Sequence, residues 1–189
     1  MGKVVLVKHA KPIITPAVPS PHWELSSEGI KQAENLSRKL DKYSIDTIFS
    51  SEEPKAIQTA KTVSKQLNCP IAIKKNLHEH ERLKNQKIYP EKEWKRLIDA
   101  FFTRPDELIF GEETAVQARE RFDRAMKSLL ADRTAQQDKV IVTHGTVISL
   151  FVEKYNSVKG FELWNKLGLP SYVELDAKTF RLLETVNLD

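Results

Sequence analysis

Two histidines stand directly after apolar runs that are typical of buried strands. Residues 4–8 lead into His9, and residues 140–143 lead into His144. In open α/β proteins, the carboxyl ends of parallel strands line the crevice in which ligands bind. We therefore expect His9 and His144 to meet at one edge of a sheet, although they lie far apart in the chain.

These residue types suit phosphoryl transfer. A neutral histidine held in one tautomer can attack phosphorus, and a second histidine can stabilise charge on the phosphoryl oxygens. The reaction also needs positive charge, which Lys8 beside His9 and Lys55 after the second strand would supply. A helix that opens after His144, at Gly145, would offer backbone N–H groups to the same anion. The leaving oxygen needs a proton, and Glu79, after the third strand, is the best-placed acid.

The elements that must position these residues alternate between strands and helices. The sequence predicts strands at 4–7, 47–50, 71–73 and 140–143, then a hairpin of 172–175 and 180–183. It predicts helices that begin near Ser26 or Ser27 and near Pro54, and further helices at 94–102, 114–130, 146–155 and 161–167. The first helix would bury Ile30, Ala33, Leu36 and Leu40.

This order predicts an α/β fold. We expect one three-layer domain over residues 1–189, with a mostly parallel central sheet and helices on both faces. The least regular stretch, residues 77–110, is expected to be a lid or specificity insertion that covers the site.

The composition is that of an ordinary globular protein, with 189 residues, 40% hydrophobic and 30% charged. The single cysteine, Cys69, excludes an intramolecular disulfide and fits a reducing cytoplasm, where we expect the protein to reside. No apolar run has the length of a membrane span or the form of a signal peptide, so no membrane association is expected. The net charge of +4 suits a small phosphorylated substrate, but without a clustered basic face it does not indicate nucleic acid. The oligomeric state stays open.

Six segments share one resemblance: Lys8-His9-Ala10, residues 25–33, residues 50–60, Leu77-His78-Glu79, Gly111-Glu112 and Thr143-His144-Gly145. In this order they resemble the histidine phosphatase superfamily, which contains cofactor-dependent phosphoglycerate mutases and many small phosphatases. The resemblance covers nearly the whole chain. It implies that His9 is the phosphorylated nucleophile and His144 its partner. It further implies that Lys8 and Lys55 hold the phosphate and that Glu79 donates the proton.

The chain departs from that family at the phosphate clamps. Lys8 and Lys55 replace the two family arginines, and Ala10 replaces a glycine. Lysine keeps the charge but lacks the planar fork that grips two phosphate oxygens. Losing both forks predicts binding weaker by about a few kcal/mol, and a rate lower by roughly 100-fold or more. If both lysines face the phosphoryl group, their like charges should depress their pKa values.

Three functions fit these residues. The first is a phosphomonoesterase that works through a phosphohistidine on a small anionic phosphate ester. The second is a phosphoglycerate-type mutase, which needs a long closed lid to exclude water; at 189 residues the chain is short for such a lid. The third is a weak or inactive relative that binds a phospholigand or a partner.

Neither a metal nor another cofactor is expected. His78 and His80 flank Glu79, and together with the histidine pair they suggest a metal site. No His-x-x-x-His helix or known ligand spacing supports one, so we expect both to face solvent or the pocket rim.

Overall fold

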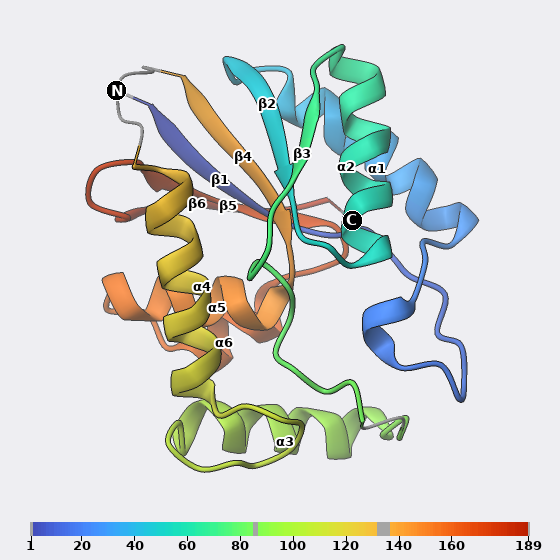
Figure 1. The fold of residues 1–189 in the computed structure, drawn as a ribbon, viewed down its shortest axis with the longest axis vertical. Coiled ribbons are helices and arrows are strands. Elements are labelled where there is room, and N and C mark those ends of the chain that lie inside the picture. Colours follow the sequence, from blue (N-terminus) through green and yellow to red (C-terminus); the bar gives the residue numbers. More distant parts are fainter. Residues whose placement is uncertain (1, 85–86, 132–136, 189) are drawn as a thin grey trace.

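A six-stranded sheet forms the centre of the molecule (Figure 1). The computed structural model describes residues 2–84, 87–131 and 137–188. The strands are β1 (Lys3–Lys8), β2 (Ile45–Ser50), β3 (Ile71–Ile73), β4 (Asp138–Thr143), β5 (Ser171–Asp176) and β6 (Leu182–Asn187). Their spatial order is β3-β2-β4-β1-β5-β6. The first four pair in parallel, and β5 and β6 add an antiparallel edge beside β1.

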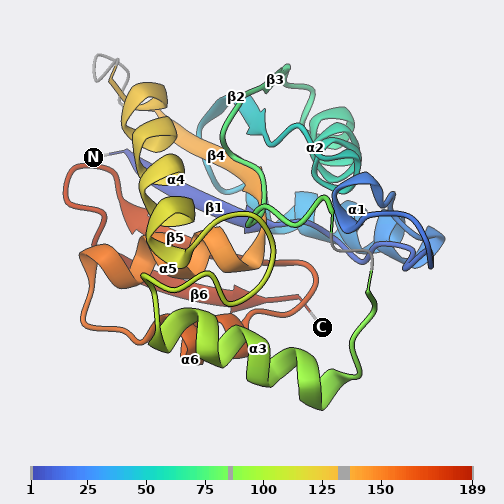
Figure 2. The same cartoon turned by 60° about the horizontal axis from the view of Figure 1, so that its bottom comes forward.

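Helices cover both faces of this sheet, which confirms the predicted three layers (Figures 1 and 2). On one face lie α1 (Ser27–Leu40) and α2 (Pro54–Leu67). On the other lie α4 (Ala115–Leu129), α5 (Gly145–Tyr155) and α6 (Gly160–Lys166). Helix α3 (Glu91–Thr103) forms an outer layer against α6, and a short 3-10 helix, η1 (Ser20–His22), lies in the loop after β1.

The alternation of side chains along β1 explains why two cores form. Val4 and Leu6 point into the core under α4 and α5, whereas Val5 and Val7 point into the core under α1 and α2. All four are fully buried, as a parallel strand covered on both faces requires. This burial holds the end of β1 rigidly where His9 begins.

The helix starts follow from local capping chemistry. The Ser26 hydroxyl accepts the backbone N–H of Gly29 at 2.9 Å and caps α1. Thr114 and Gln117 form a capping box at the start of α4. One predicted core residue was wrong, because Ile30 is 45% exposed on the solvent side of α1.

The closing hairpin differs from its prediction in the second strand. Phe180 does not begin a strand but lies in the turn, with a left-handed φ of 58°. Its ring packs on Phe151 and Tyr155 at centroid distances of 5.0 and 4.9 Å. Strand β6 therefore begins at Leu182, since the turn residue is drawn into the core.

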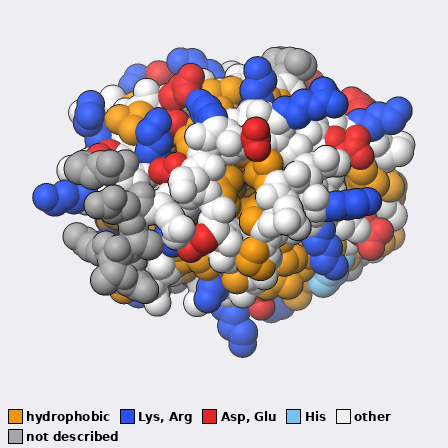
Figure 3. All heavy atoms as spheres, turned by 90° about the horizontal axis from the view of Figure 1, so that it is seen from above, with side chains coloured by type: hydrophobic (Ala, Val, Ile, Leu, Met, Phe, Trp, Pro, Cys, Tyr) orange, Lys and Arg blue, Asp and Glu red, His pale blue; other side chains and the backbone are white. Residues whose placement is uncertain are grey.

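The surface carries charges of both signs. On the face in Figure 3, the described Lys and Arg side chains are interspersed with Asp and Glu. None of the described helices is long and apolar enough to cross a membrane.

Candidate active site

The histidine pair lies where two adjacent parallel strands end. Residue Lys8 of β1 is in register with Thr143 of β4, and the His9 N–H donates to the Thr143 carbonyl at 3.1 Å. The ring centroids of His9 and His144 are 5.2 Å apart, and the rings are inclined by 62°. His9 is 7% exposed and His144 is fully buried. The structure thus brings together the two histidines that the sequence singled out.

The hydrogen bonding of His9 suits a nucleophile. Its Nδ1 lies 2.8 Å from the carbonyl oxygen of Ala10, which can only accept, so Nδ1 carries the proton. Burial, together with the charges of His144, Lys55 and Lys8, holds the pKa of His9 well below its ordinary value. The ring is therefore neutral at neutral pH, and Nε2 keeps its lone pair.

His144 is held by the loop between β2 and α2. Its Nε2 lies 2.9 Å from the Ser51 hydroxyl and 3.5 Å from Oε1 of Glu53. Its Nδ1 is buried and has no hydrogen-bond partner among the described residues. Burial and the nearby charge of Lys55 lower the pKa of His144 well below its usual range. When Ser51 donates to Nε2, the proton of the neutral ring is on Nδ1 and is available to an incoming ligand.

Lys8 is largely buried between two later elements. Its Nζ donates to the Leu167 carbonyl, after α6, at 2.7 Å, and its side chain lies against Gly145. Burial lowers the pKa of Lys8 to about 8, although the carboxylate of Glu79 opposes that shift.

Lys55 lies on the first turn of α2 and is already paired. Its Nζ contacts Oε2 of Glu53 at 2.5 Å and donates to the Ser20 carbonyl at 2.7 Å. Burial lowers the pKa of Lys55, against the opposing effect of Glu53. Both lysine pKa values are thus depressed, as predicted, but burial is the main cause. The like charge that acts on Lys55 is Arg82 rather than Lys8.

Glu79 lies at the amino end of α5. Its carboxylate accepts N–H bonds from Thr146 at 3.1 Å, from Val147 at 3.3 Å and from His80 at 3.0 Å. Burial favours the neutral acid, but His144, Arg82 and these amides outweigh it and lower the pKa of Glu79. Glu79 is therefore ionised in the free protein.

The sequence predicts that the amino end of α5 binds the substrate phosphate, but in the structure its amides contact the carboxylate of Glu79. Two of its amides, those of Thr146 and Val147, already donate to this carboxylate. A phosphate role for Gly145 stays a prediction. A Cβ at Gly145 would lie 3.0 Å from Cε of Lys8, so a larger residue here would displace the Lys8 side chain.

Three site residues were missed by the sequence analysis. Glu53 is buried and its carboxylate has three neighbours. It pairs with Lys55, lies close to His144, and accepts a hydrogen bond from the backbone N–H of Glu79 at 2.8 Å. The positive charge of Arg82 interacts with the carboxylates of Glu53 and Glu79, and its buried Nε has no hydrogen-bond partner in the part of the chain that the structure describes. No periodic pattern marks either residue.

The third missed residue, Arg121 of α4, positions the loop that carries Glu79. Its guanidinium donates to the carbonyls of Asn76, His78 and Glu79 at 3.1, 3.0 and 3.1 Å. It also pairs with Glu113 at 2.5 Å. Arg121 of α4, which lies 42 positions after Glu79 in the chain, thereby holds the backbone of Glu79 in place.

His78 and His80 line the same cavity, but their side chains have different partners. The Nε2 of His78 lies 3.2 Å from Glu81. His80 lines the larger cavity, in line with a place at the pocket rim, but it does not face solvent: it is 1% exposed and packs between Phe101 and Phe110, whose carbonyl lies 2.9 Å from its Nε2. Among the described residues, no three His, Cys, Asp or Glu side chains form a metal-binding group.

A cavity of about 570 Å³ opens beside these groups. Its lining includes Glu53, Glu79, Arg82 and His22. Its volume falls within the range of about 300–1,000 Å³ that is common for small-molecule sites. A small ligand can therefore approach the carboxylate pair through it.

The sequence of this chain matches a known protein family. The model of the histidine phosphatase superfamily (branch 1) matches residues 4–183, so the chain belongs to that superfamily. A protein of Proteus mirabilis named "Probable phosphoglycerate mutase GpmB" is 27% identical over 157 residues, which are 79% of this chain and 66% of that protein. The chain thus spans just under two thirds of that relative's length.

Solved structures agree in fold. The mycobacterial glucosyl-3-phosphoglycerate phosphatase superposes with a TM-score of 0.73 at 18% identity, over 99% of this chain and 98% of that one. The alpha-ribazole phosphatase of Shigella flexneri superposes with a TM-score of 0.71 at 21% identity, over 98% and 96% of the two chains. These likenesses confirm the predicted α/β architecture.

Proposed function

We propose that this protein is a phosphomonoesterase that hydrolyses small phosphate esters through a phosphohistidine on His9. The observation that carries the proposal is the state of His9. It is neutral, its Nδ1–H donates to the Ala10 carbonyl, and it lies beside His144 and near the buried Lys55 and the partly buried Lys8. In this arrangement, Nε2 of His9 keeps its lone pair, and the positively charged side chains near it can stabilise a phosphoryl group that it attacks.

In the first step, Nε2 of His9 would attack phosphorus while the bond from phosphorus to the alcohol oxygen breaks. The alcohol would leave with a proton from Glu79. Because Glu79 is ionised in the free protein, this proton must be acquired when the substrate binds. The negative charge of the phosphoryl group raises the pKa of a neighbouring carboxyl and favours this.

In the second step, water would attack the phosphohistidine and Glu79 would accept its proton. The bond from phosphorus to nitrogen breaks, which restores neutral His9 and releases phosphate. Lys8, Lys55 and the Nδ1–H of His144 would stabilise the phosphoryl oxygens in both steps. The proposed chemistry requires no metal ion.

A covalent labelling experiment tests the mechanism. Brief incubation with a labile phosphate ester should give a label that is lost in acid and stable in base. The label should be present in wild type and absent from His9→Ala. A label that persists in His9→Ala would assign the nucleophile elsewhere.

One observation favours a second candidate, a phospholigand-binding protein with little turnover. Glu53 neutralises Lys55 and lies close to His144, which places a carboxylate where the phosphoryl group would bind. Chromogenic ester hydrolysis at saturating enzyme distinguishes the two, since a binding protein would show no difference between wild type and His9→Ala. The mutase alternative requires product analysis with phosphoglycerates.

A further inference from the structure

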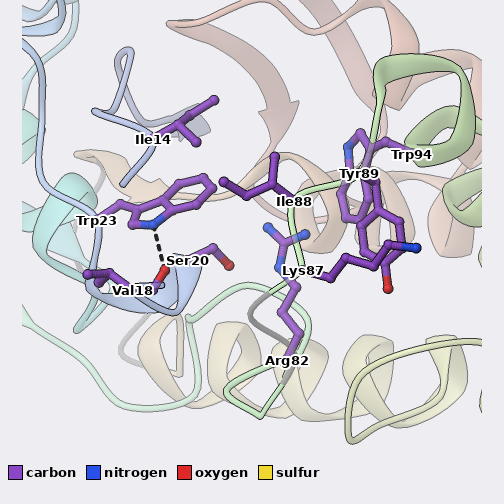
Figure 4. Close-up of a pocket in the computed structure, with 9 residues that line it drawn as sticks. All are labelled: Ile14, Val18, Ser20, Trp23, Arg82, Lys87, Ile88, Tyr89 and Trp94. Atoms are coloured by element: carbon purple, nitrogen blue, oxygen red, sulfur yellow. Dashed lines mark hydrogen bonds between the residues drawn. The ribbon is translucent and has the colours of Figure 1, made fainter. Parts of the chain in front are cut away.

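A second, smaller cavity lies beside the phosphate site, between the loop after β1 and the segment before α3 (Figure 4). Its volume is about 200 Å³. Most of its lining is apolar or aromatic, and those side chains are Ile14, Val18, Trp23, Ile88, Tyr89 and Trp94. Figure 4 shows Ile14 and Trp23 on one side, Tyr89 and Trp94 on the other, and Arg82 reaching between them.

The aromatic walls are held in place by their own contacts. The indole N–H of Trp23 donates to the Val18 carbonyl at 2.9 Å, so its polar atom is already satisfied. The rings of Tyr89 and Trp94 stack at a centroid distance of 6.1 Å and an angle of 25°. The cavity therefore offers fixed apolar faces, which suit a flat or branched apolar group.

The charges of the lining select against a cation. Arg82 lies over the Trp94 ring at 4.7 Å, and Lys87 lies over the Tyr89 ring at 4.5 Å. None of the described lining residues is acidic. An aromatic cage usually suits a quaternary ammonium, but here the ring faces already carry cations.

This cavity shares a wall with the phosphate site. The Ser20 carbonyl accepts from Lys55, and Ser20 lines the cavity. Arg82 lines both this cavity and the larger one that contains Glu53 and Glu79. A group attached to a bound phosphoryl group can therefore extend past Arg82 into the apolar space.

We propose that this cavity binds the alcohol part of the substrate, and that the preferred substrates are phosphate esters of uncharged apolar or aromatic alcohols. The inference rests on the proposed function. The volume exceeds an engineered cavity of about 150 Å³ that holds benzene, but it is smaller than the roughly 300 Å³ of a complete ligand site. It therefore fits one ring or one short branched chain.

A pair of substrates of equal shape tests the charge selection. In 3,3-dimethylbutyl phosphate, a neutral tert-butyl group replaces the trimethylammonium group of phosphocholine. The two esters therefore have the same shape and differ in the positive charge. We expect kcat/KM to favour the neutral ester at least about tenfold. Equal values would overturn the proposal.

Adjacent isoleucines supply matched variants. Ile14 lines the cavity and Ile13 does not, and both are exposed, at 57% and 51%. Ile14→Glu should shift the preference toward phosphocholine by about tenfold or more, while Ile13→Glu should leave it unchanged. A gain on one substrate cannot arise from poor folding. Equal shifts in both variants would mean that the cavity does not bind the alcohol.

Calorimetric binding separates this proposal from the proposed function. Phenylphosphonate, which cannot be hydrolysed at its carbon–phosphorus bond, should bind more tightly than methylphosphonate in wild type and Ile13→Glu, and by a smaller factor in Ile14→Glu. If this holds without turnover of any ester, the phosphatase proposal fails and the cavity assignment stands. If esters are hydrolysed without any effect of the apolar group, the cavity assignment fails alone.

Discussion

In the proposed mechanism, Lys8 makes activity depend on pH, because its ammonium must be charged to bind the phosphoryl group. Burial lowers its pKa to about 8, whereas an arginine would keep its charge throughout. We expect kcat/KM to fall about tenfold for each pH unit above 8, as the free protein loses this proton. In Lys8→Arg this fall should begin at higher pH.

The control for this measurement is Lys11→Arg. Lys11 is exposed and paired with Glu28, so its replacement should not move the alkaline limb. An unchanged limb in Lys8→Arg would mean that Lys8 is not the ionising clamp. The maximal rate of Lys8→Arg does not test this role, since it also depends on whether the larger guanidinium fits between Gly145 and Leu167.

Glu79 presents the opposite problem, because an acid must be protonated but this carboxyl is ionised in the free protein. We expect Glu79→Gln to slow alkyl phosphates by about 100-fold or more, since their alkoxide leaving groups need a proton. Nitrophenyl phosphate should lose much less, because its phenolate leaves without one. Steady-state kinetics on the two esters measures the difference. Equal losses would assign Glu79 a positioning role.

At the scale of elements, α4 fixes the loop after β3 through Arg121. Arg121→Lys would lose the fork that holds three carbonyls and Glu113 together. We expect a loss of about 2–4 kcal/mol in the free energy of unfolding, measured in urea, and a lower kcat. If kcat of Arg121→Lys falls on alkyl phosphates but not on nitrophenyl phosphate, the group displaced by the substitution is Glu79, the proposed acid.

Arg124→Lys on the same helix provides the comparison. Arg124 is 73% exposed at its side chain and pairs only loosely with Glu120, at 3.8 Å. Its replacement should change stability by less than about 0.5 kcal/mol. A similar loss in both variants would place the effect in α4 itself and not in the loop.

For the whole molecule, the prediction concerns metal ions. The positive charge of the site comes from Lys8, Lys55, Arg82 and, on protonation, His144, so a divalent cation is not needed to stabilise the phosphoryl oxygens. We expect full activity after exhaustive chelation. Activity that is lost and then restored by zinc or manganese would contradict this.

Much of the fold could be predicted because its signals are local. A run of β-branched residues such as 140–143 predicts a buried strand wherever it lies, and Ser26 or Pro54 marks a helix start through its own backbone chemistry. The deviations arose where packing overrides local preference. Ile30 has the right spacing for a core face but faces solvent, and Phe180 is apolar but occupies a turn.

The sequence by itself determined the α/β class and the two strand ends that carry His9 and His144, since strand propensity and a polar stop are encoded in neighbouring residues. Only the tertiary structure decided the charges around them. Glu53 pairs with Lys55 and lies close to His144. Arg82, from the irregular segment before α3, interacts with Glu53 and Glu79, and Glu79 accepts a backbone N–H bond at the start of α5. These contacts join residues distant in the chain, and burial, which sets their pKa values, is a property of the packed whole.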